Sequence, residues 1–461
     1  MTMPKSKKIL LVNPNIHPYF GRYVNCTLTL GNMYPLGLLN LASYLQKNGY
    51  AVKIFDALDC GADEKNVGSV IRDYAPDIVG LTHSLYCSFP PVLNIARLCK
   101  KINPRITTVI GGILPSYLDN EILANCEDID FIIKGEGEYP FLELIKSLCS
   151  GVSLNNIERL SYRGKTVADS AKKDYMTIPD FDIEPRRLNK LFIAGSRLSY
   201  FRKGGNVYIE ASRGCRYSCK FCIVNNFSCG IKYKDPKQLV SEIEGYWADF
   251  GITYFRFTDS TFTENRKFVY SILDEIAKRN LQKKIKWRCS TRVDCVDRDL
   301  LKDMRKSGCV RIGFGVESYS QQDLDYYRKR ITLEQVIESF RLTKESGIKT
   351  AALLILDQYR YRKYQALREE LKKVAGLLRN IKPDFVIYAP LIIYPHTLIY
   401  DEYLKLQVIE KEGWRLLLKG HLVPSSPVSE SHIFNLINRA KLSFTAAKCF
   451  NRLVISLINK G

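Results

Sequence analysis

Apolar runs alternate with amphipathic stretches through the first 150 residues of the chain. Runs rich in Val, Ile and Leu predict five buried parallel strands, at Lys8–Val12, Ala51–Asp56, Asp77–Thr82, Arg105–Ile110 and Asp130–Lys134. The stretches between them have helical spacing, as in Leu36–Asn48, Val92–Lys101 and Tyr139–Ser147. This alternation predicts an α/β fold with a doubly wound, Rossmann-like sheet, whose ligand would lie at the carboxyl ends of the strands.

The alternation stops over residues 151–205, where short hairpin-like pieces and prolines predict a connector. Six further strands are predicted at Val207–Glu210, Tyr254–Thr258, Ile285–Thr291, Val310–Gly315, Lys349–Leu356 and Asp384–Ala389. Helical stretches between them include Pro236–Phe250, Asn265–Arg279, Leu333–Ser346 and Leu367–Asn380. Six βα units are fewer than a closed eight-fold barrel requires, so we expect a partial barrel. The expected domains are therefore residues 1–150 and 206–400, followed by a helical C-terminal region at 401–461.

Composition narrows the class of protein. With 461 residues, 46% hydrophobic and 25% charged, the chain is expected to be globular, with two or three domains. No apolar run reaches the roughly 18 residues that a membrane span needs, and no secretory signal is recognised, so a cytoplasmic location is expected.

The formal net charge is +21, but the basic residues are spread along the chain rather than gathered in a block, which makes nucleic acid an unlikely partner. The tail from Arg439 to Lys460 carries five basic residues and no acidic one, among apolar residues at near-helical spacing. A helix packed on the barrel is the favoured interpretation of this tail. Peripheral contact with an anionic membrane is the alternative.

Three of the 14 cysteines form one group, Cys215, Cys219 and Cys222, with the spacing C-x3-C-x2-C after a predicted strand. Thiolates bind soft metals, and cysteines on one loop can surround a single iron–sulfur cluster. Three thiolates for four irons leave one iron open to a small molecule. A zinc site with Cys229 as the fourth ligand is the alternative.

This motif, with Phe221 before its last cysteine and a partial barrel after it, resembles that of the radical S-adenosylmethionine (SAM) superfamily. The resemblance implies a [4Fe–4S] cluster held by Cys215, Cys219 and Cys222, whose open iron binds the amino and carboxylate groups of SAM. Reduction would then yield a 5′-deoxyadenosyl radical that abstracts hydrogen from unactivated carbon.

Downstream segments resemble further elements of the same superfamily. Asp259 lies in FRFTDSTFTEN, Arg292 ends the strand of KWRCSTRVD, and IGFGVESYS matches a G-x-E-S element. The resemblance implies SAM contacts at Phe221, Asp259, Arg292, Gly315, Glu317 and Ser318. Tyr394–Thr397 is similar to a Y-P-G-T element, with His396 where Gly is usual. One departure is the turn at Asp357–Arg360, where related enzymes have G-x-P-G-E-T, and its role is left open.

The strand ends of the first domain carry P-L-G-L, V-I-G-G and K-G-E-G-E-Y-P-F, which together resemble the cobalamin-binding domain of cobalamin-dependent radical SAM enzymes. The resemblance implies a flavodoxin-like domain and cobalamin contacts at Pro35, Leu36, Gly37, Thr82, Ser84, Gly111, Gly112, Gly135, Glu136, Gly137 and Glu138. No D-x-H-x-x-G loop is present, and His17 is expected to be an ordinary loop histidine rather than a cobalt ligand.

The function implied by this resemblance is a cobalamin-dependent radical SAM methyltransferase that acts on unactivated carbon through methylcobalamin. Its partners would be a small-molecule or lipid-like substrate and a low-potential electron donor, flavodoxin or ferredoxin. A non-methylating cyclase or rearrangement enzyme on the same scaffold is the first alternative. A non-enzymatic cobalamin sensor with a structural cluster is the second. The sequence does not identify the substrate or the residues that act on it.

Overall fold

A computed structural model describes residues 7–20, 35–83, 89–165, 185–193, 201, 205–224, 230–360 and 363–410, together with positions 415, 426, 429, 431, 433, 435 and 437. Ser84, Cys229 and the basic tail at 439–460 lie outside the described residues. Among the helices that are described, none is long and apolar enough to cross a membrane.

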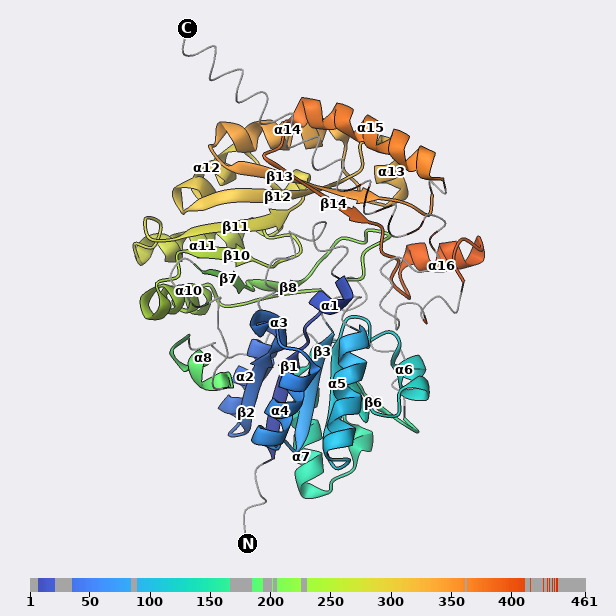
Figure 1. The fold of residues 1–461 in the computed structure, drawn as a ribbon. Coiled ribbons are helices and arrows are strands. Elements are labelled where there is room, and N and C mark those ends of the chain that lie inside the picture. The colour runs from blue at the N-terminus through green and yellow to red at the C-terminus, as the bar shows by residue number, and fades with distance from the viewer. Residues whose placement is uncertain are drawn as a thin grey trace.

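The first sheet has the strand order β2-β1-β3-β4-β5-β6 (Figure 1). Five strands are parallel: β1 Lys8–Asn13, β2 Ala51–Asp56, β3 Ile78–His83, β4 Thr107–Gly112 and β5 Phe131–Ile133. Their interiors are aliphatic and buried, because helices cover both faces of the sheet. The predicted doubly wound domain is confirmed.

The helices of this domain pack in two pairs. Helix α2 (Leu36–Lys47) contacts α7 (Glu138–Ser150), and α4 (Glu64–Tyr74) contacts α5 (Phe89–Ile102). Shorter helices are α1 His17–Phe20, α3 Ala57–Cys60 and α6 Asp119–Asn125. Strand β6 (Leu160–Tyr162) pairs antiparallel with β5, so the beginning of the expected connector is a sixth strand of this sheet.

The second sheet has six parallel strands in the order β14-β13-β12-β11-β10-β7. They are β7 Asn206–Ile209, β10 Tyr254–Phe257, β11 Lys286–Thr291, β12 Cys309–Glu317, β13 Lys349–Leu356 and β14 Phe385–Pro390. Since β14 and β7 are the two edges, the sheet is an open half-barrel, as predicted. Its helices are α10 Pro236–Phe250, α11 Arg266–Lys278, α12 Arg298–Lys306, α13 Gln321–Tyr326, α14 Leu333–Glu345, α15 Tyr364–Ile381 and α16 Leu398–Lys405.

Local sequence explains where these helices begin. Asp235 caps α10 through the amide groups of Lys237 and Gln238, and Pro236 occupies the first turn, where no amide donor is needed. Thr332 and Gln335 form a reciprocal capping box at the start of α14. Such signals account for the accurate prediction of α10, whose observed bounds are those expected.

A short antiparallel hairpin, β8 (Ser212–Gly214) with β9 (Ile231–Tyr233), was not predicted. It lies directly after β7, and the cysteine motif follows its first strand. The hairpin therefore positions the start of the segment that carries the three cysteines.

Residues 185–193 and Phe201 contact elements of both domains. Helix α8 (Pro185–Leu191) contacts both β2 and α10, and Phe192 makes a parallel bridge to Ile54 at the edge of the first sheet. The ring of Phe192 packs against Phe201, which stacks on Tyr246 of α10. One continuous apolar core consequently includes buried residues of both domains.

Candidate active site

The three clustered cysteines lie on the loop that follows β8, and all three are partly exposed. Backbone hydrogen bonds fix this loop from two sides. The Lys220 amide donates to the Tyr327 carbonyl at 2.9 Å, and the Ile399 amide donates to the Lys220 carbonyl at 3.1 Å. The loop is therefore fastened to the segments that follow β12 and β14.

Burial is the main influence on the pKa of Cys219 and of Cys222. Burial, with smaller contributions from the neighbouring thiols Cys219 and Cys215, raises the pKa of Cys222 to about 11. Burial also raises the pKa of Cys219, while the positive charges of Lys329 and Arg292 lower it. Lys329 is paired with Glu317 and Arg292 with Asp294, so their charges offset only part of the effect of burial on Cys219.

The cysteine loop offers three thiol donors, and Cys229, the fourth donor of the alternative zinc site, lies outside the described residues. Within the described part of the chain, no three His, Cys, Asp or Glu side chains converge closely enough to hold one metal ion. A cluster with several irons is larger and takes each thiolate on a different iron. Three thiols on one loop therefore match the ligand set of an iron–sulfur cluster.

Arg292, which follows β11, points one unused donor into the interior near Cys219. Its Nε and Nη2 atoms each donate to Asp294 at 2.8 Å, and Nη2 also donates to the Lys329 carbonyl at 2.7 Å. The guanidinium lies 3.8 Å from the centre of the Tyr217 ring. Its Nη1 is buried and has no hydrogen-bond partner among the described residues. A fixed, buried donor of this kind can bind an anionic group.

The end of β12 is shaped by a close ion pair. Lys329 Nζ lies 2.7 Å from Glu317 Oε1, and both side chains are nearly buried. Glu317 has a left-handed backbone, with φ 63°. A Cβ on Gly315 would lie 2.6 Å from the Glu317 carboxylate and 2.7 Å from Lys329 Nζ, so a larger residue at that position would displace this pair.

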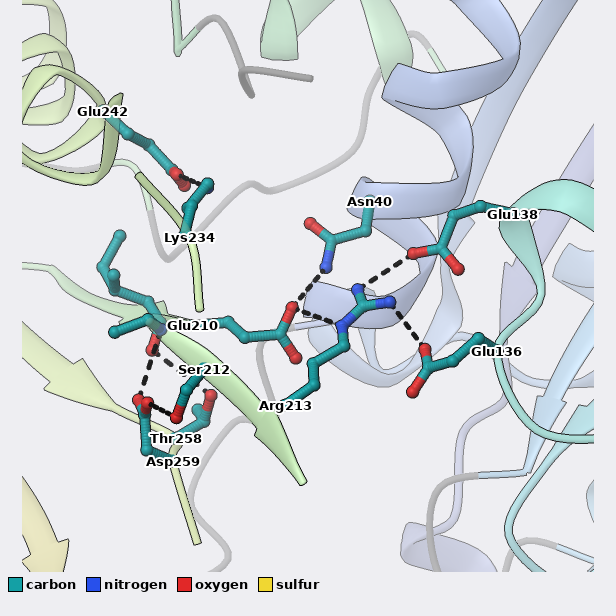
Figure 2. Close-up of polar contacts among 12 residues, drawn as sticks. Asn40, Glu136, Glu138, Glu210, Ser212, Arg213, Lys234, Glu242, Thr258 and Asp259 are labelled. Carbon is teal, nitrogen blue, oxygen red and sulfur yellow. Dashed lines mark hydrogen bonds and ion pairs between the residues drawn. The ribbon is translucent and has the colours of Figure 1, made fainter. Parts of the chain in front are cut away.

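The other predicted SAM residues make supporting contacts. Asp259 accepts hydrogen bonds from Ser212 Oγ at 2.5 Å and from the Ala211 amide at 3.3 Å (Figure 2). Burial raises the pKa of Asp259 to about 7.

Two more of the predicted SAM residues contact the segment after β12. Ser318 Oγ donates to Asp323 at 2.9 Å, and Phe221 packs edge-on against the Tyr327 ring. These three side chains brace the site, and direct contact with SAM stays a prediction.

A second site is a cavity at the carboxyl ends of β1, β3, β4 and β5. Of the residues predicted there, nine line it: Leu36, Gly37, Thr82, Gly111, Gly112, Gly135, Glu136, Gly137 and Glu138. Pro35 is not among its lining residues, and its carbonyl accepts a hydrogen bond from the Leu39 amide at the start of α2. The glycines leave room: a Cβ on Gly37 or Gly137 would have no atom within 4 Å.

The barrel domain supplies part of this cavity. Glu210 and Arg213 line the cavity together with Asn40 from α2. Glu210 lies just before β8, and Arg213 lies within it. Sequence reasoning missed all three residues. The available signal was position along the chain, because Glu210 ends a predicted strand and Arg213 lies two residues before Cys215.

Arg213 forms ion pairs with three carboxylates from the two domains (Figure 2). Its nitrogens lie 2.6 Å from Glu136, 2.9 Å from Glu138 and 2.8 Å from Glu210. Asn40 Nδ2 also donates to Glu210, at 3.2 Å. The carboxylates of Glu136 and Glu138 are thus bound by Arg213, and burial raises the pKa of Glu136 to about 7.

Two histidines of the first domain differ in environment. His17 is exposed, and its amide donates to Asn15 Oδ1 in the loop after β1. His83, at the end of β3, is buried against Phe89, and burial lowers its pKa to about 3, so the ring is neutral. Neither residue lines the cavity.

Family profiles match the two domains separately, and individual known proteins match across both. The sequence profile of the Radical SAM superfamily matches residues 209–371, and that of the B12 binding domain matches residues 24–145. An uncharacterized methyltransferase of Pyrococcus horikoshii is 26% identical over 452 residues, covering 95% of this chain and 93% of that protein. The anaerobic magnesium-protoporphyrin IX monomethyl ester cyclase of Rubrivivax gelatinosus is 29% identical over 405 residues, covering 86% of this chain and 70% of the cyclase.

Among solved structures, the radical SAM methyltransferase TsrM from Kitasatospora setae, with tryptophan and a SAM analogue bound, has a similar fold. The TM-score is 0.68 at 20% identity, over 87% of this chain and 76% of TsrM. Both the order of the domains and the half-barrel agree with that architecture. The protein is a radical SAM enzyme, and its cofactors are a [4Fe–4S] cluster, SAM and cobalamin. It belongs to those members of the radical SAM superfamily that carry an N-terminal B12-binding domain.

Proposed function

We propose that the protein transfers a methyl group to an unactivated carbon of a small or lipid-like molecule bound between its two domains. One observation carries this proposal: the cavity of the B12-binding domain is completed by Glu210 and Arg213, which immediately precede the cysteine loop of the barrel. This arrangement would bring the two cofactor sites to opposite sides of a shared space. When bound, the cluster and SAM supply a carbon-centred radical for hydrogen abstraction, and cobalamin supplies the methyl group.

The residues near Cys219 have roles that suit binding of SAM. We assign Arg292 to the SAM carboxylate, because its Nη1 is buried and lacks a partner among the described residues. Asp294 and the Lys329 carbonyl hold the guanidinium in place for this contact. Glu317 and Lys329 neutralise one another, so the wall beside the cysteines carries no excess negative charge that would repel the SAM carboxylate.

The glycines of the first domain suit close approach by a bulky cofactor. Gly37 and Gly137 line the cavity, and a side chain at either position would extend into open space. We assign these two positions, with Gly111, to contact with cobalamin. The charged residues of the same wall, Glu136 and Glu138, would then support the wall through Arg213 rather than meet cobalamin directly.

An electron donor is required because the radical is formed by reduction. We propose a low-potential flavodoxin or ferredoxin, and a net charge of +21 favours an acidic partner.

We also propose that the protein is cytoplasmic and that its tail at 439–460 can contact an anionic membrane. Sedimentation of the full chain with and without anionic lipid vesicles would test it.

The products of SAM distinguish the candidate functions. Full-length protein reconstituted anaerobically with iron, sulfide and hydroxocobalamin, then given SAM, a reductant and a cell extract as substrate source, should yield both 5′-deoxyadenosine and S-adenosylhomocysteine. A cyclase, as the 29% identical relative is named, would yield 5′-deoxyadenosine alone. A sensor would cleave no SAM. Either of the last two results would refute methyl transfer.

A further inference from the structure

Arg213 binds carboxylates from both domains at once, and it lies two residues before Cys215. Three different nitrogens take part: Nη1 contacts Glu136, Nη2 contacts Glu138 and Nε contacts Glu210. The side chains of Arg213 and Glu138 are 7% and 8% exposed, so this ion pair is shielded from water, whereas Glu136 and Glu210 are partly exposed. Loss of the guanidinium would leave the buried Glu138 carboxylate without its counterion, which is costly.

The partners of Arg213 belong to two separate walls of the cobalamin cavity. Glu136 and Glu138 flank Gly137 on the turn between β5 and α7. Glu210 is held from the opposite side by Asn40 of α2. A ligand that fixes these walls therefore also fixes the position of Arg213.

The path from Arg213 to the cluster loop is short. Strand β8 ends at Gly214, whose φ of 101° turns the chain directly into Cys215. A shift of the backbone at Arg213 would consequently be passed to the first cysteine. Lysine has one ammonium group and could not replace three directional contacts to separate carboxylates.

We infer that Arg213 is a positioning residue that couples the cobalamin cavity to the cluster loop, so that occupation of either site raises the affinity of the other. The inference rests on the proposed function, since it takes the cavity as the cobalamin site. Coupling between two sites is reciprocal, and typical values change affinity by about 5- to 150-fold. It can therefore be measured without turnover.

The test compares the affinity of full-length protein for hydroxocobalamin with and without the cluster. For the unaltered chain we expect cluster-loaded protein to bind about fivefold more tightly than protein from which iron has been removed by chelation. Arg213→Met should reduce this ratio to about one, and Arg213→Lys should give a value between. Hydroxocobalamin should also change the electron paramagnetic resonance spectrum of the reduced cluster in the unaltered protein but not in Arg213→Met.

Two further variants keep the result interpretable. Glu136→Gln removes one charge from the other side of the interface and should lower the ratio even if Arg213→Met fails to fold. Arg279→Met is the matched control, because Arg279 pairs with Glu244 and Glu275 within the barrel alone, and it should leave the ratio unchanged.

The possible failures are distinct. Unaltered protein that takes up no hydroxocobalamin would overturn the proposed function together with this inference. Uptake with equal affinity in cluster-loaded and cluster-free protein would overturn only the inference. The same holds if Arg213→Met and Glu136→Gln both retain the full ratio.

Discussion

The Tyr327 hydroxyl donates a hydrogen bond to Asp357 Oδ2 at 2.9 Å, and both residues are buried. Asp357 opens the turn after β13, a segment in which the sequence departs from the superfamily pattern. It also accepts hydrogen bonds from the Tyr403 hydroxyl and from the amides of Tyr359 and Arg360. The Tyr327 carbonyl accepts a hydrogen bond from the amide of Lys220 in the cysteine loop. The turn at Asp357 therefore supports the cysteine loop through Tyr327.

Replacing Asp357 by Ala should therefore damage the cluster site as well as the fold. The change leaves the hydroxyls of Tyr327 and Tyr403 without their acceptor, and each buried unpaired group costs about 1–3 kcal/mol. We expect a lower free energy of unfolding and less iron bound after reconstitution. Tyr319→Phe, which removes a hydroxyl bound to Glu370 in the same domain, is the matched control and should retain its iron. Full iron content in Asp357→Ala would contradict this role.

Asp259 should make stability depend on pH. Its pKa is raised to about 7 in the folded protein by burial, against about 3.9 in an unfolded chain. Between these values the folded state holds a proton that the unfolded state has lost, so this contribution stabilises at low pH and disappears as the pH rises toward 7. The slope can reach about 1.4 kcal/mol per pH unit.

Asp259→Asn cannot titrate and should lack this component. Anaerobic denaturant titrations of both proteins between pH 5 and 8 would measure it as the difference between their two profiles. Parallel profiles would show that Asp259 is ionised throughout this range.

Arg292→Lys should weaken binding of SAM while the cluster remains. A lysine cannot bind Asp294 with two nitrogens and present a third, so the donor assigned to the SAM carboxylate is lost. We expect at least a tenfold increase in the dissociation constant, measured by isothermal titration of cluster-loaded protein with SAM. Arg256→Lys, at a guanidinium that stacks on Tyr208 away from the cysteines, serves as the control. Equal affinity of both variants for SAM would contradict the assignment of Arg292 to the SAM carboxylate.

Two glycines of the cobalamin cavity should respond differently to alanine. Gly112 has φ 117°, and a Cβ there would lie 2.2 Å from the His83 carbonyl oxygen, so Gly112→Ala should destabilise the first domain severely. A Cβ on Gly37 meets no atom within 4 Å, so Gly37→Ala should fold normally but bind hydroxocobalamin more weakly. Thermal unfolding and absorbance titration would separate these effects. A stable Gly112→Ala protein would refute the first expectation.

Sequence patterns predicted both sheets because each strand has a local apolar signature, and β2, β13 and α10 have the predicted bounds. The β8–β9 hairpin was missed because its strands have three residues each, too few for a periodic signal. Strand β6 lies in a segment predicted to be hairpin-like but assigned to the connector, because its pairing with β5 is not visible in the sequence.

The site was predictable only where a motif is contiguous. Cys215, Cys219 and Cys222 share one short segment, whereas Glu138 and Arg213 meet across 75 residues of sequence. No local pattern encodes such a pairing, which depends on how the two domains pack. Asp357 was recognised as a departure, but its tyrosine partners lie 30 and 46 residues away and could not be inferred.

The aromatic contacts from Phe192 through Phe201 to Tyr246 should affect how the protein unfolds. Proteins with several domains commonly unfold in steps, each domain melting at its own temperature. Here the interior is continuous, so heating should release both halves in one cooperative transition. For the same reason, either domain expressed alone would expose an apolar surface that the other domain normally covers, and we expect it to aggregate.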